Sequence, residues 1–330
     1  IETPLSGVKR LLEPSEQLWY RRVFNVAFNA AKERVLLHFG VNIQCDLPVK
    51  QWGKYKGEDL KLMTAADHVR FDEGVFDRIT DRMAAKGLNT IVLDLEEALY
   101  YPSHPELAVK GTWSVERFRR KLEQLRAKGL EPIPKLNFST THDIWLKEYH
   151  KMVSTPQYYR VCADVIVDVI DIFDTPRYFH IGFDEETHEH QRKHSISIVR
   201  QGELWWHDFL FIVKEVEKRG VRAWCWSDKI WHAKDEFLNR MPKSVLQSNW
   251  YYADAFALDD SNKNRFRVQA YIDLDKAGFA YEKVLADENP ELARQYGVKQ
   301  APTLVLVKED GIERYRGVSD IKGWLMHKDA

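Results

Sequence analysis

Short apolar runs alternate with longer amphipathic runs along most of the chain. The apolar runs have the length of buried strands, and the amphipathic runs have apolar residues at helical spacing. The strands predicted from this pattern cover residues 34–40, 89–95, 131–138, 177–183, 221–226 and 244–250, with a weaker one at 196–201. The predicted helices cover residues 74–87, 114–129, 156–173, 203–220 and 271–279, with Ser114 as the N-cap of the second helix. Because strands and helices take turns, the pattern predicts parallel βα units.

The repetition of these units favours a (β/α)8 TIM-like barrel over an open doubly wound sheet. No GxGxxG turn follows a predicted strand, so nothing indicates a dinucleotide site. Seven strand candidates precede Phe279, and a barrel of seven strands would leave an open edge. We therefore expect an eighth strand at residues 281–286, parallel to the first. Residues 1–278 would then form the barrel, and residues 279–330 a small C-terminal βα appendage.

The composition indicates a globular protein whose function depends on specific sites. The formal net charge is -1 over 330 residues, so no overall field favours nucleic acid or an anionic membrane as a partner. No run reaches the roughly 18 apolar residues of a membrane helix, and the N-terminus has no signal-like apolar core. We expect a cytoplasmic protein, although a chain that begins at Ile1 leaves room for a processed leader. The oligomeric state stays open.

The cysteines and tryptophans exclude few functions of the protein. Cys45, Cys162 and Cys225 are far apart and form no CxxC, which predicts free thiols and no disulfide framework. Eleven tryptophans is a high number, and several of them follow predicted strands. Their flat faces can stack on a sugar or fill a core, and the sequence leaves both interpretations open.

Polar and aromatic side chains follow five of the predicted strands, at the end where a barrel places its active site. They are Asp94, Glu96 and Glu97, then Asn137 and His142, then Asp184 and Glu185, then Trp226 and Asp228, and finally Asn249, Trp250 and Tyr251. Five such groups at one end predict a functional site. The acids at residues 184–186 have a simpler interpretation as a helix start, since carboxylates are favoured near a helix N-terminus. A catalytic carboxylate pair is the alternative.

The residues of this set resemble a known family. In FHIGFDEE, the residues His180, Gly182, Asp184 and Glu185 match the HxGxDE motif of the β-N-acetylhexosaminidases, glycoside hydrolase family 20. EPIPKLNFSTTH, which ends at His142, is similar to the third-strand segment of that family. LNTIVLDLEEALYYPSHPEL is similar to its second-strand segment. The resemblance preserves the order of the motifs over residues 34–250 and implies a barrel with glycosidase activity.

The resemblance also implies roles for individual residues. Glu185 would be the general acid, with a pKa raised by a partly apolar wall and by Asp184. Asp184 would orient the 2-acetamido group of the substrate, whose own oxygen attacks with net retention. Trp226, Trp250 and Tyr251 would wall the sugar pocket. The other implied substrate-binding residues are Arg34, Asp94, Glu97, Asn137, His142, His180 and Asp228. A carbohydrate is the implied partner, and no cofactor is implied.

The chain departs from the family pattern at several positions. Phe183 replaces a second glycine, and Thr140 and Thr141 replace a Pro-Gly before the histidine. Lys135 and Asn137 replace acidic residues. These departures leave two alternatives open, a glycosidase for a different sugar and a non-catalytic carbohydrate-binding barrel.

Two further patterns suggest other functions. His190 and His194 have the i,i+4 spacing of metal ligands on one helical face, but HExxH fails because Arg192 occupies the second histidine position. The sequence therefore predicts no metal site. Residues 274–325 resemble the later part of a thioredoxin- or glutaredoxin-like fold, with Pro302 in the place of the cis-proline that precedes a strand in that fold. The CxxC of that fold is absent, so we expect no redox role.

Overall fold

The computed structural model describes residues 34–38, 66–85, 88–192, 194, 196–251, 257–279, 303–308 and 311–316. These residues fall into two compact units. The larger unit holds a parallel sheet with its helices. The smaller unit holds strands β7, Thr303–Lys308, and β8, Gly311–Arg316, which pair antiparallel. The strand predicted after Pro302 is thereby confirmed, whereas the thioredoxin-like resemblance stays a prediction.

The sheet of the larger unit has six parallel strands in the order of the sequence. They are β1 (Arg34–His38), β2 (Thr90–Asp94), β3 (Glu131–Lys135), β4 (Tyr178–His180), β5 (Arg222–Trp226) and β6 (Leu246–Ser248). A doubly wound sheet would reverse its strand order part-way, and this sheet does not. The parallel α/β prediction is therefore confirmed. The complete barrel and the domain boundary at residue 278 stay predictions, because the closing strand at 281–286 lies outside the described residues.

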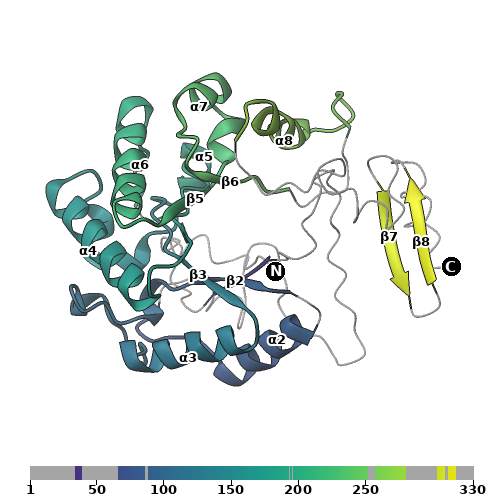
Figure 1. Cartoon of the computed structure of the whole chain (residues 1–330). Helices are drawn as coiled ribbons and strands as arrows, with labels where there is room; N and C mark the ends of the chain where they lie inside the picture. Colours follow the sequence, from purple (N-terminus) through teal and green to yellow (C-terminus); the bar gives the residue numbers. More distant parts are fainter. Residues whose placement is uncertain are drawn as a thin grey trace, which may run out of the picture. The chain divides into compact units, whose positions relative to one another are not determined.

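The helices follow the strands along the outer side of the sheet, as α3, α4 and α6 show (Figure 1). The described α-helices are α2 (Glu73–Ala85), α3 (Val115–Ala127), α4 (Pro156–Ile172), α5 (His188–Gln191), α6 (Gly202–Glu217), α7 (Lys234–Arg240) and α8 (Arg265–Lys276). Short 3-10 segments are η2 (Glu96–Ala98), η3 (Pro105–Leu107), η4 (Ile144–Lys151) and η5 (Asp228–Trp231). Ser114 caps α3 as the sequence predicts, because its side chain accepts a hydrogen bond from the Arg117 N–H.

Both faces of the sheet are buried along β2–β6, which explains why the interior positions of these strands are mainly apolar. One face carries a small cluster to which each of the strands β2–β6 contributes a single residue. This cluster consists of Val92, Ile133, Tyr178, Trp224 and Leu246. The other face packs under the helices, and Ile91 and Leu93 belong to that larger core. The alternation along β2 follows from the two-residue period of a strand.

One predicted element is wrong in the structure, and another has different bounds. Residues 196–201 form no strand, because Arg200 in this segment is buried and its guanidinium joins Glu186 and Asp208 instead of a strand ladder. The helix predicted at 271–279 begins earlier, at Arg265, and ends at Lys276. The three consecutive acids also open no helix, since α5 begins only at His188.

The structure shows the environment of two of the cysteines and of several tryptophans. Cys162 and Cys225 are free and buried, as predicted, whereas Cys45 lies outside the described residues. Trp145, Trp205 and Trp206 fill the core. In the part of the chain that the structure describes, no helix combines the length and the apolar character that crossing a membrane requires.

Candidate active site

The C-terminal ends of the sheet strands lie side by side, so the residues that follow them meet at one edge. Asp94 at the end of β2 is in register with Lys135 at the end of β3, and Lys135 is in register with His180 at the end of β4. Trp226 at the end of β5 pairs in the same way with Ser248 of β6. The structure thus places the predicted strand-end residues of β2–β6 along one edge.

The chain turns sharply after β4, and this turn brings two acids to one side. Gly182, Phe183 and Glu185 have φ values of 75°, 70° and 57°. A Cβ on Gly182 would lie 1.9 Å from Asn137 Oδ1, so only glycine fits there. For Phe183 and Glu185, left-handed backbone costs on the order of 1–3 kcal/mol each. This strain lets the adjacent Asp184 and Glu185 face the same space, which a regular strand would not allow.

Asp184 is held by side chains from the segment after β3. Asn137 Nδ2 donates a hydrogen bond of 2.8 Å to Asp184 Oδ1, and Asp184 Oδ2 lies 3.4 Å from His142 Nε2. The hydroxyls of Ser139 and Thr141 donate to the Asp184 carbonyl oxygen at 2.5 and 3.2 Å. Both the carboxylate and the backbone of Asp184 are therefore fixed.

Glu185 lies between two histidines. Its Oε2 is 3.1 Å from His142 Nε2 and 3.1 Å from His190 Nε2. Burial opposes the charged carboxylate, but the hydrogen bond with His142 and the charges of His142, His190 and Arg267 together lower the pKa of Glu185. The expected raised pKa is therefore wrong for this structure, because the neighbours of the carboxylate are basic side chains and not only an apolar wall.

His142 carries the opposite shift. Burial by itself disfavours the imidazolium, yet the charge of Asp184 and the hydrogen bond with Glu185 raise the pKa of His142 to about 9. At neutral pH the His142–Glu185 pair therefore holds one proton.

A buried group of charges lies behind these acids. Lys135 Nζ lies 2.5 Å from Asp94 Oδ2, and both side chains are almost wholly buried. Glu96 Oε1 accepts a hydrogen bond of 3.1 Å from the Asn137 N–H. Burial and the charge of Asp94 raise the pKa of Glu96 well above its usual range. The ion pair between Asp94 and Lys135 links the ends of β2 and β3.

His180 lies among aromatic rings. Its ring centroid is 4.9 Å from that of Trp224 and 4.5 Å from that of Trp226. Its Nδ1 accepts a hydrogen bond of 3.1 Å from the Gly182 N–H. Burial and the nearby charge of Lys135 lower the pKa of His180 well below its usual range. The predicted substrate-binding residue is thus a neutral, buried imidazole beneath Trp226.

Half-buried tryptophans stand near the strand ends of β5 and β6. Trp226 ends β5, and Trp250 follows β6. Trp250 contacts Trp231 with ring centroids 4.5 Å apart, and the Arg267 guanidinium lies 4.4 Å from both of those rings. The sequence analysis did not identify Trp231 and Arg267, which the structure places against Trp250.

Two other predicted residues have protein partners. Tyr251 Oη donates to Asn262 Oδ1 at 3.5 Å. Asp228 is buried, and its Oδ2 accepts a hydrogen bond of 2.7 Å from the Glu185 N–H. Burial and the charge of Asp184 raise the pKa of Asp228 well above its usual range. Asp228 therefore fixes the strained backbone of Glu185.

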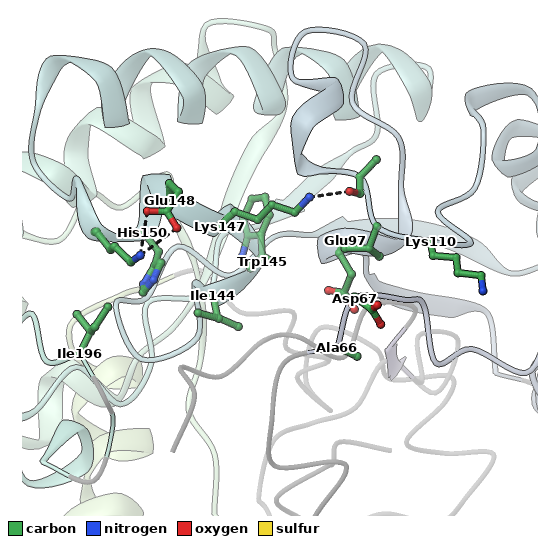
Figure 2. A pocket seen from close by; sticks show the side chains of 13 residues that line it. Ala66, Asp67, Glu97, Lys110, Ile144, Trp145, Lys147, Glu148, His150 and Ile196 are labelled. Atoms are coloured by element: carbon green, nitrogen blue, oxygen red, sulfur yellow. Dashed lines mark hydrogen bonds and ion pairs between the residues drawn. The ribbon is translucent and has the colours of Figure 1, made fainter. Parts of the chain in front are cut away.

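Glu97 belongs to a different hollow. A cavity of about 730 Å³ is lined by Glu97, Trp145, Lys147 and His150 among others, and neither of the paired acids lines it (Figure 2). Lys147 Nζ donates hydrogen bonds to the backbone carbonyl oxygens of Glu106 and Ala108. For Arg34, the structure describes the backbone in β1 and not the side chain.

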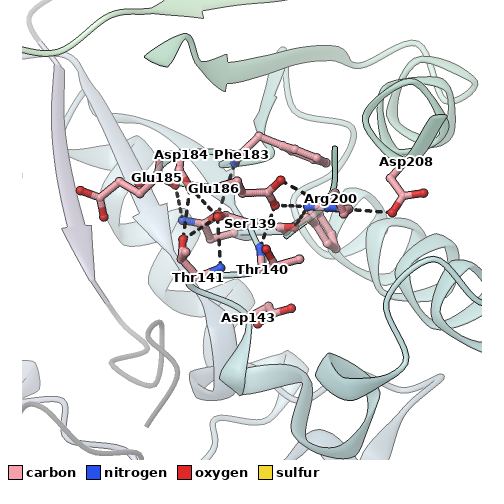
Figure 3. Close-up of polar contacts among 12 residues, drawn as sticks. Ser139, Thr140, Thr141, Asp143, Phe183, Asp184, Glu185, Glu186, Arg200 and Asp208 are labelled. Atoms are coloured by element: carbon pink, nitrogen blue, oxygen red, sulfur yellow. Dashed lines mark hydrogen bonds and ion pairs between the residues drawn. The ribbon is translucent and has the colours of Figure 1, made fainter. Parts of the chain in front are cut away.

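The third acid of the motif has a structural partner that the sequence did not reveal. Glu186 is directed towards Arg200, whereas Glu185 extends away from it (Figure 3). Arg200 also contacts Asp208 at 3.2 Å and donates to the Phe138 carbonyl oxygen at 2.9 Å. The Thr140 N–H donates to Glu186 Oε1 at 2.8 Å. The sequence signal of this network was the charged Arg200 within the predicted strand at 196–201.

No protein-family model matches the chain, and no curated protein matches it. Among solved structures, it is similar to a β-hexosaminidase mutant from Streptomyces plicatus in complex with GlcNAc, with 14% identity and a TM-score of 0.49. That match covers 74% of this chain and 46% of the other. It is also similar to a GH20 exo-β-N-acetylglucosaminidase from Vibrio harveyi, with 16% identity and a TM-score of 0.48 over 65% of this chain and 39% of the other. A β-N-acetylhexosaminidase from Bacteroides fragilis matches with 14% identity and a TM-score of 0.47, over 63% of this chain and 46% of the other.

The chain thus spans less than half the length of these three solved structures. By name, these structures are β-N-acetylhexosaminidases or related glycosidases, the family whose motifs this sequence resembles. At this identity and TM-score, the function proposed below rests on the site residues of this chain and not on these similarities.

Proposed function

We propose that this chain is a glycoside hydrolase that removes terminal β-linked N-acetylhexosamine with retention of configuration. The observation that carries the proposal is the pair of adjacent acids after β4, each held by a different side chain from the segment after β3. Asn137 positions Asp184, and His142 lies 3.1 Å from Glu185. A glycosidase needs a proton donor for the leaving oxygen and a group that manages positive charge at the anomeric carbon. Two separately positioned acids supply both functions.

In the proposed first step, the acetamido oxygen of the substrate forms a bond to the anomeric carbon while the bond to the leaving oxygen breaks. Glu185 passes a proton to that oxygen, and His142 is the reservoir from which the pair obtains it. Asp184 accepts a hydrogen bond from the acetamido N–H and stabilises the positive charge that develops there. In the second step, water attacks the anomeric carbon, the bond from that carbon to the acetamido oxygen breaks, and Glu185 takes the proton that the water loses. Two inversions give net retention.

The half-buried tryptophans complete the proposed sugar site. Trp226 and Trp250 are half-buried at the strand ends of β5 and β6, and their flat apolar faces suit the apolar side of a pyranose ring. Tyr251 is directed at Asn262, so a hydrogen bond from Tyr251 to the acetamido oxygen would require its hydroxyl to exchange partners.

A carbohydrate-binding barrel without catalysis is the second candidate. The observation that favours it is the lowered pKa of Glu185, whose carboxylate is engaged by two histidines and is charged at neutral pH. A charged carboxylate cannot donate a proton, whereas it can accept hydrogen bonds from sugar hydroxyls.

One assay separates the two candidates. We expect turnover of a 4-nitrophenyl β-N-acetylglucosaminide or β-N-acetylgalactosaminide, with the β-anomer as the first product seen by NMR. The matching β-glucoside, which lacks the acetamido group, should be turned over far more slowly. Equal turnover of the glucoside would contradict the substrate-assisted step. Sugar binding without turnover of any aryl hexosaminide would establish the non-catalytic candidate.

A further inference from the structure

Three side chains from separate segments bring ligand atoms together beside the paired acids. His142 follows β3, Glu185 lies in the turn after β4, and His190 belongs to α5. Glu185 Oε2 is 3.1 Å from the Nε2 atoms of both histidines. One ligand atom from each of the three residues lies within 4.8 Å of the other two. Two imidazoles and a carboxylate thus converge on one point.

We propose that His142, Glu185 and His190 form a binding site for a borderline divalent cation such as Zn²⁺. Tetrahedral zinc has bonds of about 2.0–2.2 Å, which place neighbouring ligand atoms roughly 3.3–3.5 Å apart. The two histidine–carboxylate distances are already close to that value. The ligand nitrogens of the two imidazole rings lie within 4.8 Å of each other, so they need to approach by at most about 1.5 Å to reach that separation.

The surroundings suit a cation. His142 is almost wholly buried, whereas the side chains of Glu185 and His190 are 19% and 30% exposed. The site is therefore anchored on one side and open to water on the other, as expected for three protein ligands with a fourth position for water. Asp184 Oδ2, 3.4 Å from His142 Nε2, adds a second negative charge beside the ligands. Imidazole and carboxylate ligands favour zinc over magnesium or calcium, which prefer oxygen alone.

This site differs from the one that the histidine spacing suggested. The i,i+4 pair does not share a helical face, because α5 ends at Gln191, before His194. The proposed third ligand comes instead from His142, 43 residues before Glu185. Only the tertiary structure brings these residues together.

Metal binding would have a consequence for the reaction, and this consequence rests on the proposed function. A cation on Glu185 Oε2 would occupy the oxygen that passes the proton, so Zn²⁺ would inhibit hydrolysis. Binding itself does not depend on that reaction and can be measured without any sugar.

The test uses the full chain, freed of metal with a chelator and titrated with Zn²⁺ by calorimetry. We expect one Zn²⁺ per chain in the wild type and at least a tenfold loss of affinity in His190→Gln. His188→Gln is the matched control, because His188 is an exposed histidine on the same short helix and outside the proposed site. It should bind Zn²⁺ as the wild type does. Co²⁺ provides a second measurement, since a four-coordinate site with nitrogen ligands gives a strong visible absorption band that His190→Gln should remove.

The outcomes separate the two proposals. No Zn²⁺ binding at millimolar concentration, or equal affinity in wild type, His190→Gln and His188→Gln, would overturn the metal site. Thermal unfolding of the metal-free variants shows whether each is folded, and a folded His142→Gln should reproduce the loss seen with His190→Gln. Zn²⁺ binding without hexosaminide turnover would leave the metal site standing and reject the proposed hydrolase. Turnover of a hexosaminide, together with a Zn²⁺ affinity that is the same in His190→Gln as in the wild type, would support the hydrolase and reject the metal site.

Discussion

Asn137 Nδ2 donates a hydrogen bond of 2.8 Å to Asp184 Oδ1 and so joins the segments that follow β3 and β4. The same side chain is an acceptor, because its Oδ1 receives hydrogen bonds from the Ser139 N–H at 3.0 Å and the Phe183 N–H at 3.4 Å. One amide thus orients a proposed catalytic carboxylate and the turn that carries it. Its carbonyl oxygen also leaves no room for a side chain on Gly182.

Asn137→Ala should impair catalysis more than stability. A hydrogen bond to a charged group contributes about 1.5–3 kcal/mol, so we expect kcat/KM for an aryl N-acetylglucosaminide to fall roughly 10- to 100-fold. Most of the loss should appear in kcat, because Asp184 acts on the charge that develops during the reaction. Asn89→Ala, at the opposite end of β2, is the control and should keep wild-type kinetics. Similar kinetic losses in both variants would reject the positioning role.

Glu185→Gln should discriminate between leaving groups. A poor leaving group needs its proton from the enzyme, whereas an activated aryl group leaves without one. We therefore expect a loss of several hundredfold or more for an unactivated disaccharide and a much smaller loss for a 2,4-dinitrophenyl glycoside. Asp184→Asn should impair both alike. An unchanged rate of Glu185→Gln on every substrate would show that Glu185 is not the acid.

Gly182→Ala should be strongly destabilising. The added Cβ would meet Asn137 Oδ1 at 1.9 Å and the Asn137 Cα at 2.9 Å, in a backbone conformation with φ +75°. Overpacking costs about 1–3 kcal/mol, to which left-handed strain adds roughly 1 kcal/mol or more. Gly220→Ala has nearly the same φ, +73°, but its Cβ would meet nothing within 4 Å. Urea unfolding should show a clearly larger loss for Gly182→Ala, and equal losses would mean that the contact with Asn137 is relieved without cost.

The stability of the protein should fall below pH 6.5 in a way that depends on His180. Its folded pKa is lowered by burial and by Lys135, while its unfolded pKa is near 6.5. The unfolded chain therefore binds a proton that the folded chain does not, and stability is lost as the pH falls below about 6.5. Between pH 7.5 and 5.5 we expect the wild type to lose about 1.4 kcal/mol more than His180→Gln. Parallel urea-derived curves for the two proteins would show that His180 is not neutral in the fold.

The sequence by itself determined the local order of the elements and the strand ends at which polar side chains gather. Apolar runs and helical periodicity located β1–β6, because those signals depend on neighbouring residues only. The cap at Ser114 was predicted for the same reason. The acids Asp184 and Glu185 were proposed as a site because a motif and the end of a strand coincide in the chain.

The tertiary structure decided the electrostatics of that site. His142 and His190 set the charge of Glu185, and Arg200 takes Glu186 out of it. The predicted strand at 196–201 failed for the same reason, since pairing a buried arginine with two carboxylates outweighs a modest strand propensity. A pKa depends on which charges and how much burial surround a group, and the surrounding residues come from distant parts of the chain. Sequence order therefore located the carboxylates, while their protonation, their histidine partners and the proposed cation site follow only from how the segments after β3 and β4 pack together.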